Sequence, residues 1–152
     1  MAARVYVVTF HDLAKKQIDL RNDDIRVLLV ASNGAYDPGD TDEDPNTLSD
    51  MNGGAGVAGV EFDGAGYSRK VLSSKSLSEN TADNKVTFHA TDVTWVSLSA
   101  GTHSVEGALL FKFVTSDADN VPLAWCPYSL ATAPNGSNFK NSWPAGGIIT
   151  IS

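Results

Sequence analysis

The sequence predicts one mainly β domain, a β-sandwich or small barrel of about eight short strands. Glycine and proline, with 13 and 6 residues among 152, are as frequent as in folds with many turns. The apolar runs are short, are separated by clusters of turn residues, and in places alternate with polar residues, which is the period of a half-buried strand. A chain of this length can build one core, so residues 1–152 are expected to form a single domain.

The N-terminal part predicts one short helix at most and then the clearest strand. An apolar run, Val5–Thr9, comes first. Thr9 is of a residue type that caps helix N-termini, so Thr9–Gln17 predicts one or two helical turns. Ile25–Ala31 is rich in β-branched residues and ends at Ser-Asn-Gly, which predicts a core strand.

Residues 32–59 predict a long acidic, Gly/Pro-rich surface loop within the domain. Pro38, Pro45 and several glycines are scattered there among acidic residues and asparagine. Loops of this length are uncommon in compact domains unless they bind something or move. This segment is therefore a candidate for a binding role.

The second half of the chain predicts further short strands, of which the first four form two hairpins. In chain order they are Val60–Phe62 with Tyr67–Leu72, Val86–Phe88 with Val93–Val96, and then Val105–Val114, Ala124–Tyr128 and Gly147–Ile151. A Gly-rich or polar bend joins each pair, as in a β-hairpin. Val105–Val114 is apolar enough to be a central strand.

The acidic residues are concentrated in one segment. Asp37–Asp50 holds six of the 18 acidic residues and no lysine or arginine, so 12 acidic residues face 11 basic residues in the rest of the chain. The basic residues are dispersed in sequence and form no stripe that would follow a phosphate backbone. Nucleic acid is therefore not expected as a partner.

Three aspartates in the acidic segment have the spacing that opens an EF-hand calcium loop: Asp40, Asp42 and Asp44. Pro45 and Met51 stand where that loop requires glycine and a bidentate glutamate, which excludes an EF-hand. A looser Ca²⁺ site on the three aspartates is one alternative, and a protein without a cofactor is the other. In the second case the segment is either a solvated loop or an acidic strap that docks on a basic partner surface.

No catalytic motif is present, so an enzyme is not expected. The histidines are not part of a metalloprotease or nucleophile-elbow pattern. Gly54–Gly59 spells G-x-G-x-x-G, but it lacks the preceding strand and following helix that a dinucleotide site needs. The single cysteine, Cys126, is interpreted as a small buried hydrophobe. No apolar run approaches the roughly 20 residues that span a bilayer, and none forms a signal-peptide core, so neither a membrane nor export is expected.

The tryptophans give a second hypothesis about function. Trp95 alternates with Val93 and should face the core, whereas Trp143 lies beside proline and glycine and is either a lid over the core or an interface anchor. Exposed aromatic rings also suit a carbohydrate-binding β-sandwich. Such a module would use Trp143, Tyr128 and Ca²⁺ held by Asp40, Asp42 and Asp44.

Short elements in a fixed order carry a resemblance to a known group of proteins. They are Ile18-Asp19-Leu20, Ile25-x-Val27-x-Leu29-Val30, Tyr36-Asp37-Pro38-x-Asp40, Gly64-Ala65-Gly66-Tyr67-Ser68, Val86-Thr87-Phe88-x-Ala90-x-Asp92-Val93-x-Trp95 and Trp143-x-x-x-Gly147-Ile148-Ile149. In this order the sequence resembles small virion structural proteins of tailed bacteriophages. The resemblance covers most of the chain.

The resemblance implies a non-enzymatic capsid decoration, or cement, protein that is made in the cytoplasm of the bacterial host and resides in the virion. It implies a homo-oligomer, with a trimer favoured, that binds the major capsid protein. A tail, neck or fibre-associated position is the alternative. The residues expected to contact the partner are Asp37, Asp40, Asp42, Glu43, Asp44 and Trp143.

Overall fold

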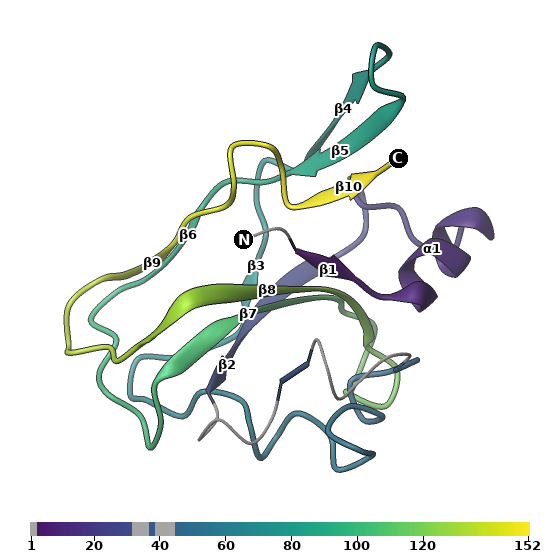
Figure 1. Cartoon of the computed structure of the whole chain (residues 1–152). Coiled ribbons are helices and arrows are strands. Elements are labelled where there is room, and N and C mark those ends of the chain that lie inside the picture. Colours follow the sequence, from purple (N-terminus) through teal and green to yellow (C-terminus); the bar gives the residue numbers. More distant parts are fainter. Residues whose placement is uncertain (1–2, 32–36, 39–44) are drawn as a thin grey trace.

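The computed structural model describes residues 3–31, 37–38 and 45–152, and this part of the chain is mainly β, with 37% strand and 6% helix. One short helix, α1 (Val7–Ala14), lies near the N-terminus. The strands are β1 (Arg4–Val5), β2 (Ile25–Ala31), β3 (Lys70–Val71), β4 (Ser76–Asn80), β5 (Lys85–His89), β6 (Val93–Trp95), β7 (Val105–Lys112), β8 (Val121–Thr132), β9 (Phe139–Asn141) and β10 (Ile149–Ile151) (Figure 1).

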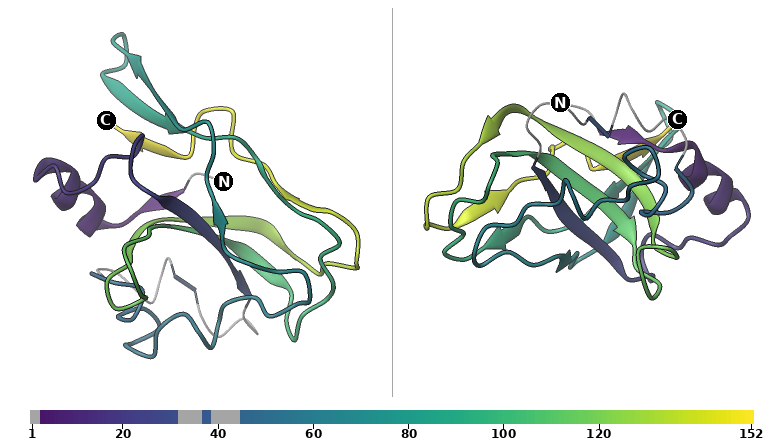
Figure 2. Two further views of the ribbon diagram at one scale, coloured as in Figure 1. Left: turned by 180° about the vertical axis from the view of Figure 1, so that it is seen from behind. Right: turned by 90° about the horizontal axis from the view of Figure 1, so that it is seen from below.

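The strands form three antiparallel sheets in two layers. The largest sheet has the order β1-β8-β7-β2-β3, and the smaller sheets are β10-β5-β4 and β6-β9. Figures 1 and 2 show the two small sheets on one side of the large sheet, as the second layer of a sandwich. No sheet closes on itself within the described ranges. The predicted mainly β sandwich with one short helix is confirmed, with ten strands in the described ranges where about eight were expected.

Strand β2 is buried on both of its faces. Ile25, Val27 and Leu29 point into the core between the two layers, whereas Leu28 and Val30 point to the opposite side, and all five side chains are fully buried. A strand covered on both faces has a continuous apolar run instead of an alternating one. The sequence of β2 has this form, which is why its bounds could be predicted to the residue.

The second face of the large sheet is covered by the described part of the predicted loop. Residues 45–59 form turns without a strand or helix, as expected, but Leu48, Met51 and Val57 are buried against β2 and β7. The description of residues 32–59 as a surface loop is therefore wrong for these three side chains. They stand singly among glycine and polar residues, so no helical or strand period revealed their burial.

The helix begins earlier than the sequence predicted. It spans Val7–Ala14, with Tyr6 as its N-cap residue. Thr9, predicted to be the cap, lies inside the helix, where its buried hydroxyl donates a hydrogen bond to the Leu123 carbonyl oxygen at 2.9 Å. The contact with β8 uses the hydroxyl that a cap would need, so the Thr9 cap is wrong.

Both predicted hairpins are wrong in their pairing. Val60–Phe62 and Lys70–Val71 do not pair with each other, because both lie along the same edge of β2. Val86–Phe88 belongs to β5, which pairs with β4 and β10, whereas Val93–Trp95 forms β6 and pairs with β9. Alternation predicts which face of a strand is buried, but it carries no information about the neighbouring strand.

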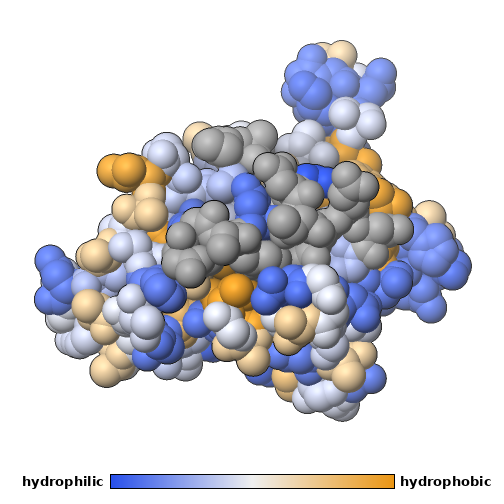
Figure 3. All heavy atoms as spheres, turned by 60° about the horizontal axis from the view of Figure 1, so that its bottom comes forward, coloured by the Kyte–Doolittle hydropathy of each residue, from blue (hydrophilic) through white to orange (hydrophobic). Residues whose placement is uncertain are grey.

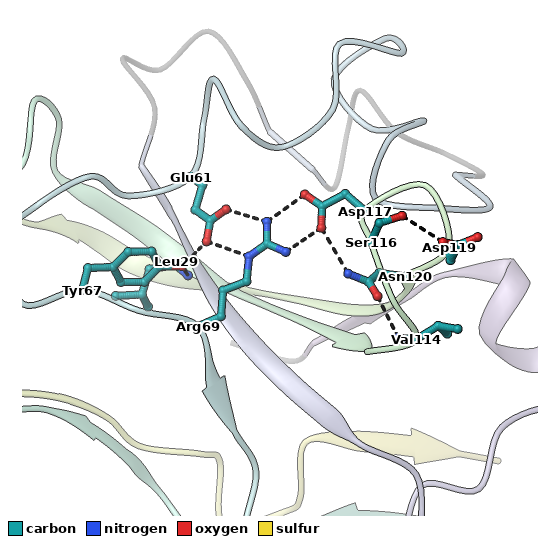
Figure 4. A network of polar contacts seen from close by, with 9 residues as sticks. All are labelled: Leu29, Glu61, Tyr67, Arg69, Val114, Ser116, Asp117, Asp119 and Asn120. Carbon is teal, nitrogen blue, oxygen red and sulfur yellow. Dashed lines mark hydrogen bonds and ion pairs between the residues drawn. The ribbon is translucent and has the colours of Figure 1, made fainter.

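An ion-pair cluster lies between the large sheet and the segment that covers its second face (Figure 4). The Arg69 guanidinium donates to the Glu61 carboxylate at 2.9 and 2.7 Å and to the Asp117 carboxylate at 2.5 and 2.8 Å. Two-pronged contacts of this kind fix direction as well as distance. Hydrogen bonding to Asp117 and Glu61 raises the pKa of Arg69, and the bond from Arg69 lowers the pKa of Asp117.

Further hydrogen bonds connect this cluster to the large sheet on one side and to the segment that covers the second face of this sheet on the other. On one side, the Tyr67 hydroxyl donates to Glu61 at 2.5 Å and accepts the Leu29 N–H of β2 at 3.2 Å. On the other side, the Asp117 carbonyl oxygen accepts the backbone N–H of Ser49 at 3.0 Å. The segment that covers the second face is therefore bonded to the residues that hold Arg69.

We expect Arg69→Met to lower the free energy of unfolding by about 2–4 kcal/mol. The methionine keeps an apolar stem but leaves the Glu61 and Asp117 carboxylates facing each other without a cation. Urea denaturation measures the change. The matched control is Lys85→Met, because Lys85 and its partner Asp83 are 3.8 Å apart with side chains 45% and 55% exposed. This control should change stability by no more than about 0.5 kcal/mol. Equal effects of the two substitutions would contradict the role of Arg69.

The cluster also predicts how stability depends on pH. Arg69 lowers the pKa of Asp117 in the folded protein, so between the folded and unfolded pKa values the unfolded chain binds more protons. The stabilisation is complete above the unfolded pKa, which is about 3.9, and is lost as pH falls through the folded value. We expect Asp117→Asn to flatten the fall of the urea midpoint below about pH 4. Asp83→Asn is the control, and identical acid limbs in wild type and Asp117→Asn would refute the linkage.

Candidate functional site

A groove of about 560 Å³ lies between the end of β8 and the segment formed by β9 and the residues that follow it. This volume is within the range of about 300–1,000 Å³ that is usual for ligand sites. The lining mixes aromatic rings with amide and hydroxyl groups. It consists of Cys126, Pro127, Tyr128, Ser129, Leu130, Thr132, Asn138, Phe139, Lys140, Asn141, Ser142, Trp143 and Pro144.

The groove lies where β8 bulges between two residues that are aligned with β7. Pro127 faces Gly107 of β7, and the next aligned pair is Thr132 with Val105, so four residues of β8 stand opposite Glu106 alone. Proline has no N–H for the ladder and is found at such bulges. Gly107 allows the close contact before the bulge, because a Cβ there would lie 2.4 Å from the Trp125 ring. The bulge turns residues 128–131 away from β7.

Aromatic rings connect the groove to the core. The ring centroids of Tyr128 and Phe139 are 6.2 Å apart, and those of Phe139 and Trp95 are also 6.2 Å apart. Beyond Trp95 the row continues to Tyr67, at 6.3 Å. Rings at these separations attract one another in edge-on or tilted arrangements. The inner wall of the groove is therefore anchored in the core.

Trp143 is held in place by two hydrogen bonds to the chain before it. Its backbone N–H donates to the Asp92 carboxylate at 3.0 Å, and its indole N–H donates to the Thr91 carbonyl oxygen at 3.1 Å. Asp92 also accepts from Lys140 at 2.8 Å. The hydrogen bond from Lys140, followed by the one from the Trp143 backbone, lowers the pKa of Asp92. The half-buried ring packs against the core and also lines the groove, so it combines the lid and the surface position that the sequence left open.

Asn141 and Tyr128 form the polar part of the inner wall. The Tyr128 hydroxyl donates to Asn141 Oδ1 at 2.7 Å, and burial raises the pKa of Tyr128. Asn141 is only 3% exposed, and its Nδ2 group has no hydrogen-bond partner within the described part of the chain. A buried polar atom left without a partner costs about 1–3 kcal/mol. Asn141 is thus the group in this wall that lacks an acceptor.

Cys126 lies at the inner side of the same groove and is a free thiol. Burial raises its pKa to about 12. At neutral pH it is therefore protonated, whereas a reactive cysteine has to be a thiolate. Its place agrees with its interpretation as a small buried hydrophobe.

The structure brings together only some of the residues that the sequence singled out. Tyr128 and Trp143 share the groove. Asp37 is exposed and lines an adjoining hollow of about 290 Å³, which shares Tyr128 and Leu130 with the groove. The other acidic candidates, Asp40, Asp42, Glu43 and Asp44, lie outside the described residues. Within residues 3–31, 37–38 and 45–152, no group of three or more His, Cys, Asp or Glu side chains is placed to hold a metal ion. The calcium site stays a prediction.

The histidines lie on separate elements. His11 is on α1, with its ring 3.0 Å from the Asp12 carboxylate. His89 ends β5, 3.1 Å from the Ser78 hydroxyl, and His103 lies in the turn before β7. None of the three lines the groove.

The residues of β9 were missed by the sequence reasoning. Phe139, Asn141 and Trp143 are spaced two apart, which places them on one face of an extended segment. This alternation was the available signal. It was obscured by the polar residues between them, Lys140 and Ser142.

In the part of the chain that the structure describes, no helix is long and apolar enough to cross a membrane. Comparisons of the chain with family models, with curated proteins and with solved structures give no match. The groove, the exposed surfaces and the order of the sequence elements are therefore the observations from which a function can be inferred.

Proposed function

We propose that this protein is a non-enzymatic structural component of a tailed-phage virion. In this proposal it is a capsid decoration protein that resides in the virion, forms a homo-oligomer, with a trimer favoured, and binds the shell of major capsid protein. The observation that supports the proposal is the order of the short sequence elements, by which the chain resembles small virion proteins of such phages.

The placement of these elements supports the proposal. Leu29, Tyr67 and Trp95 come from three of the shared elements, and all three pack in the core between the layers. The Tyr67 hydroxyl accepts the Leu29 N–H, its ring stacks on Trp95, and the Trp95 indole N–H donates to the Ser68 carbonyl oxygen at 2.7 Å. Because these residues build the core together, their order along the chain is what a common fold would preserve.

The projecting hairpin β4–β5 offers a surface for assembly. All five residues of β4 are exposed, and no described strand pairs with its outer edge. In Figure 1 the hairpin extends beyond the rest of the molecule, and Figure 3 shows a hydrophilic tip with apolar atoms at its base. A free strand edge presents N–H and C=O groups that a neighbouring subunit can pair with.

The acidic segment is the proposed contact with the shell. Residues 37–50 hold six carboxylates in a chain whose remainder is nearly neutral, and Asp37 is exposed. Complementary charge accelerates docking and selects a basic partner surface. In this mechanism the segment binds basic groups of adjacent capsid subunits and staples them together.

The test changes Asp40, Asp42 and Asp44 to Asn and Glu43 to Gln in one variant. We expect its occupancy on empty shells of the same virus to fall at least about tenfold at moderate salt, because each lost charge weakens the attraction. Co-sedimentation measures occupancy, and light scattering of the free protein gives its oligomeric state. Asp12→Asn, at a half-buried carboxylate of α1 outside the acidic segment, is the control.

Two results would count against the proposal. Unchanged occupancy of the fourfold variant would refute the acidic contact. A wild-type protein that ignores the shells altogether would refute the decoration role and favour the tail, neck or fibre position.

A further inference from the structure

We propose that the groove between β8 and β9 binds a neutral oligosaccharide. A sugar ring would lie against Trp143, and its hydroxyl groups would bond to the amide and hydroxyl groups of the lining. This inference rests on the groove alone and does not depend on a role in the virion.

The chemistry of the lining selects an uncharged ligand with both apolar and hydroxyl-bearing faces. The rings of Tyr128, Phe139 and Trp143 supply apolar area, and Asn138 and Ser142 supply hydrogen-bonding groups. The described lining residues include no carboxylate, and the one cation among them, Lys140, is already paired with Asp92 at 2.8 Å. A pyranose presents an apolar C–H face to an aromatic ring while its hydroxyls bond to polar neighbours, which fits this mixture.

The aromatic groups are fixed before a ligand arrives. Two hydrogen bonds from Trp143 hold its ring against residues 91–92, and the bond from Tyr128 to Asn141 holds the tyrosine. Binding to rigid side chains loses little conformational entropy. A weakly attractive ring–sugar contact can therefore appear as measurable affinity.

Asn141 gives an independent indication of a ligand. Its Nδ2 group is buried in the wall of the groove and has no acceptor in the described part of the chain. Buried amide groups are nearly always paired with protein, water or ligand atoms. In this structure the group is closed to solvent, so a shift of the wall has to expose it before a hydroxyl or ring oxygen of a sugar can act as its acceptor.

Tryptophan fluorescence is a direct readout, since Trp95 and Trp125 are 0% and 3% exposed and Trp143 is the tryptophan that lines the groove. The full chain is titrated with hexasaccharides of α-1,4-glucose, β-1,4-glucose, β-1,4-mannose and β-1,4-galactose, and with hexagalacturonate as the charged counterpart. Calorimetry gives the dissociation constants. We expect at least one neutral hexasaccharide to bind saturably and change the fluorescence, while hexagalacturonate does not bind.

Substitutions at two positions of the groove, Trp143 and Ser142, locate the binding. Trp143→Ala should weaken it by about tenfold or more, and Trp143→Phe, which keeps a ring, should weaken it less. Ser142→Tyr changes an exposed residue of the lining and should block the groove without unfolding the protein. Phe10→Ala, at an exposed aromatic residue on α1, should leave the dissociation constant unchanged. Urea denaturation confirms that each variant is folded.

The proposal is overturned if none of the four neutral hexasaccharides binds at millimolar concentration. It is also overturned if binding persists unchanged in both Trp143→Ala and Ser142→Tyr. Preferential binding of hexagalacturonate would contradict the neutral character assigned to the ligand.

Discussion

The burial of β2 on both faces is the constraint on which the rest of the structure depends. An antiparallel sheet can leave one face in water, but Leu28 and Val30 exclude this here, because each is fully buried on the side away from the sandwich core. The large sheet therefore needs two covers. One is made of regular strands, whose backbone groups pair with each other. The other is a run of turns that is fastened by its buried apolar side chains and by backbone hydrogen bonds from Leu48 and Ser49 to the turn between β7 and β8. Arg69, held between two carboxylates, fixes that turn to the residues beside β2.

The parts of the fold that could be predicted are those where burial alone decides the residue type. β2 and β7 are dense in apolar residues because they are enclosed, and Trp95 alternates with Val93 because one face of β6 is in the core. Strand partners could not be predicted, because a period of two does not specify which edge a strand adds to. Strand β4 has a single apolar residue, Leu77, and each of its five residues is exposed, so its sequence shows no alternation that predicts a strand. Its strand conformation follows from pairing with β5.

The candidate site, like the fold, could be predicted only in part from the sequence. Tyr128 and Trp143 could be selected from the sequence as exposed aromatic residues, but their meeting in one groove results from the bulge after Pro127 and from the bonds that fix Trp143 to residues 91–92. Neither can be inferred from composition. Asn141 contributes a buried amide to the wall of the groove. Its burial could not be predicted, because it is a polar residue in a polar segment. The acidic segment gave the clearest charge signal in the sequence, and its binding role remains the prediction that the shell experiment addresses.

The chemical state of Cys126 has a practical consequence. The half-buried thiol lines the groove and has a pKa of about 12, so at neutral pH it reacts only slowly with an alkylating reagent, because only the thiolate is nucleophilic. Local opening of β8 next to the bulge exposes the thiol to water and lowers this pKa, so opening raises the labelling rate. Because the chain contains one cysteine, the mass gained on labelling is assigned to a single residue. Mass spectrometry of the labelled protein can therefore follow local opening of the groove without an added probe site.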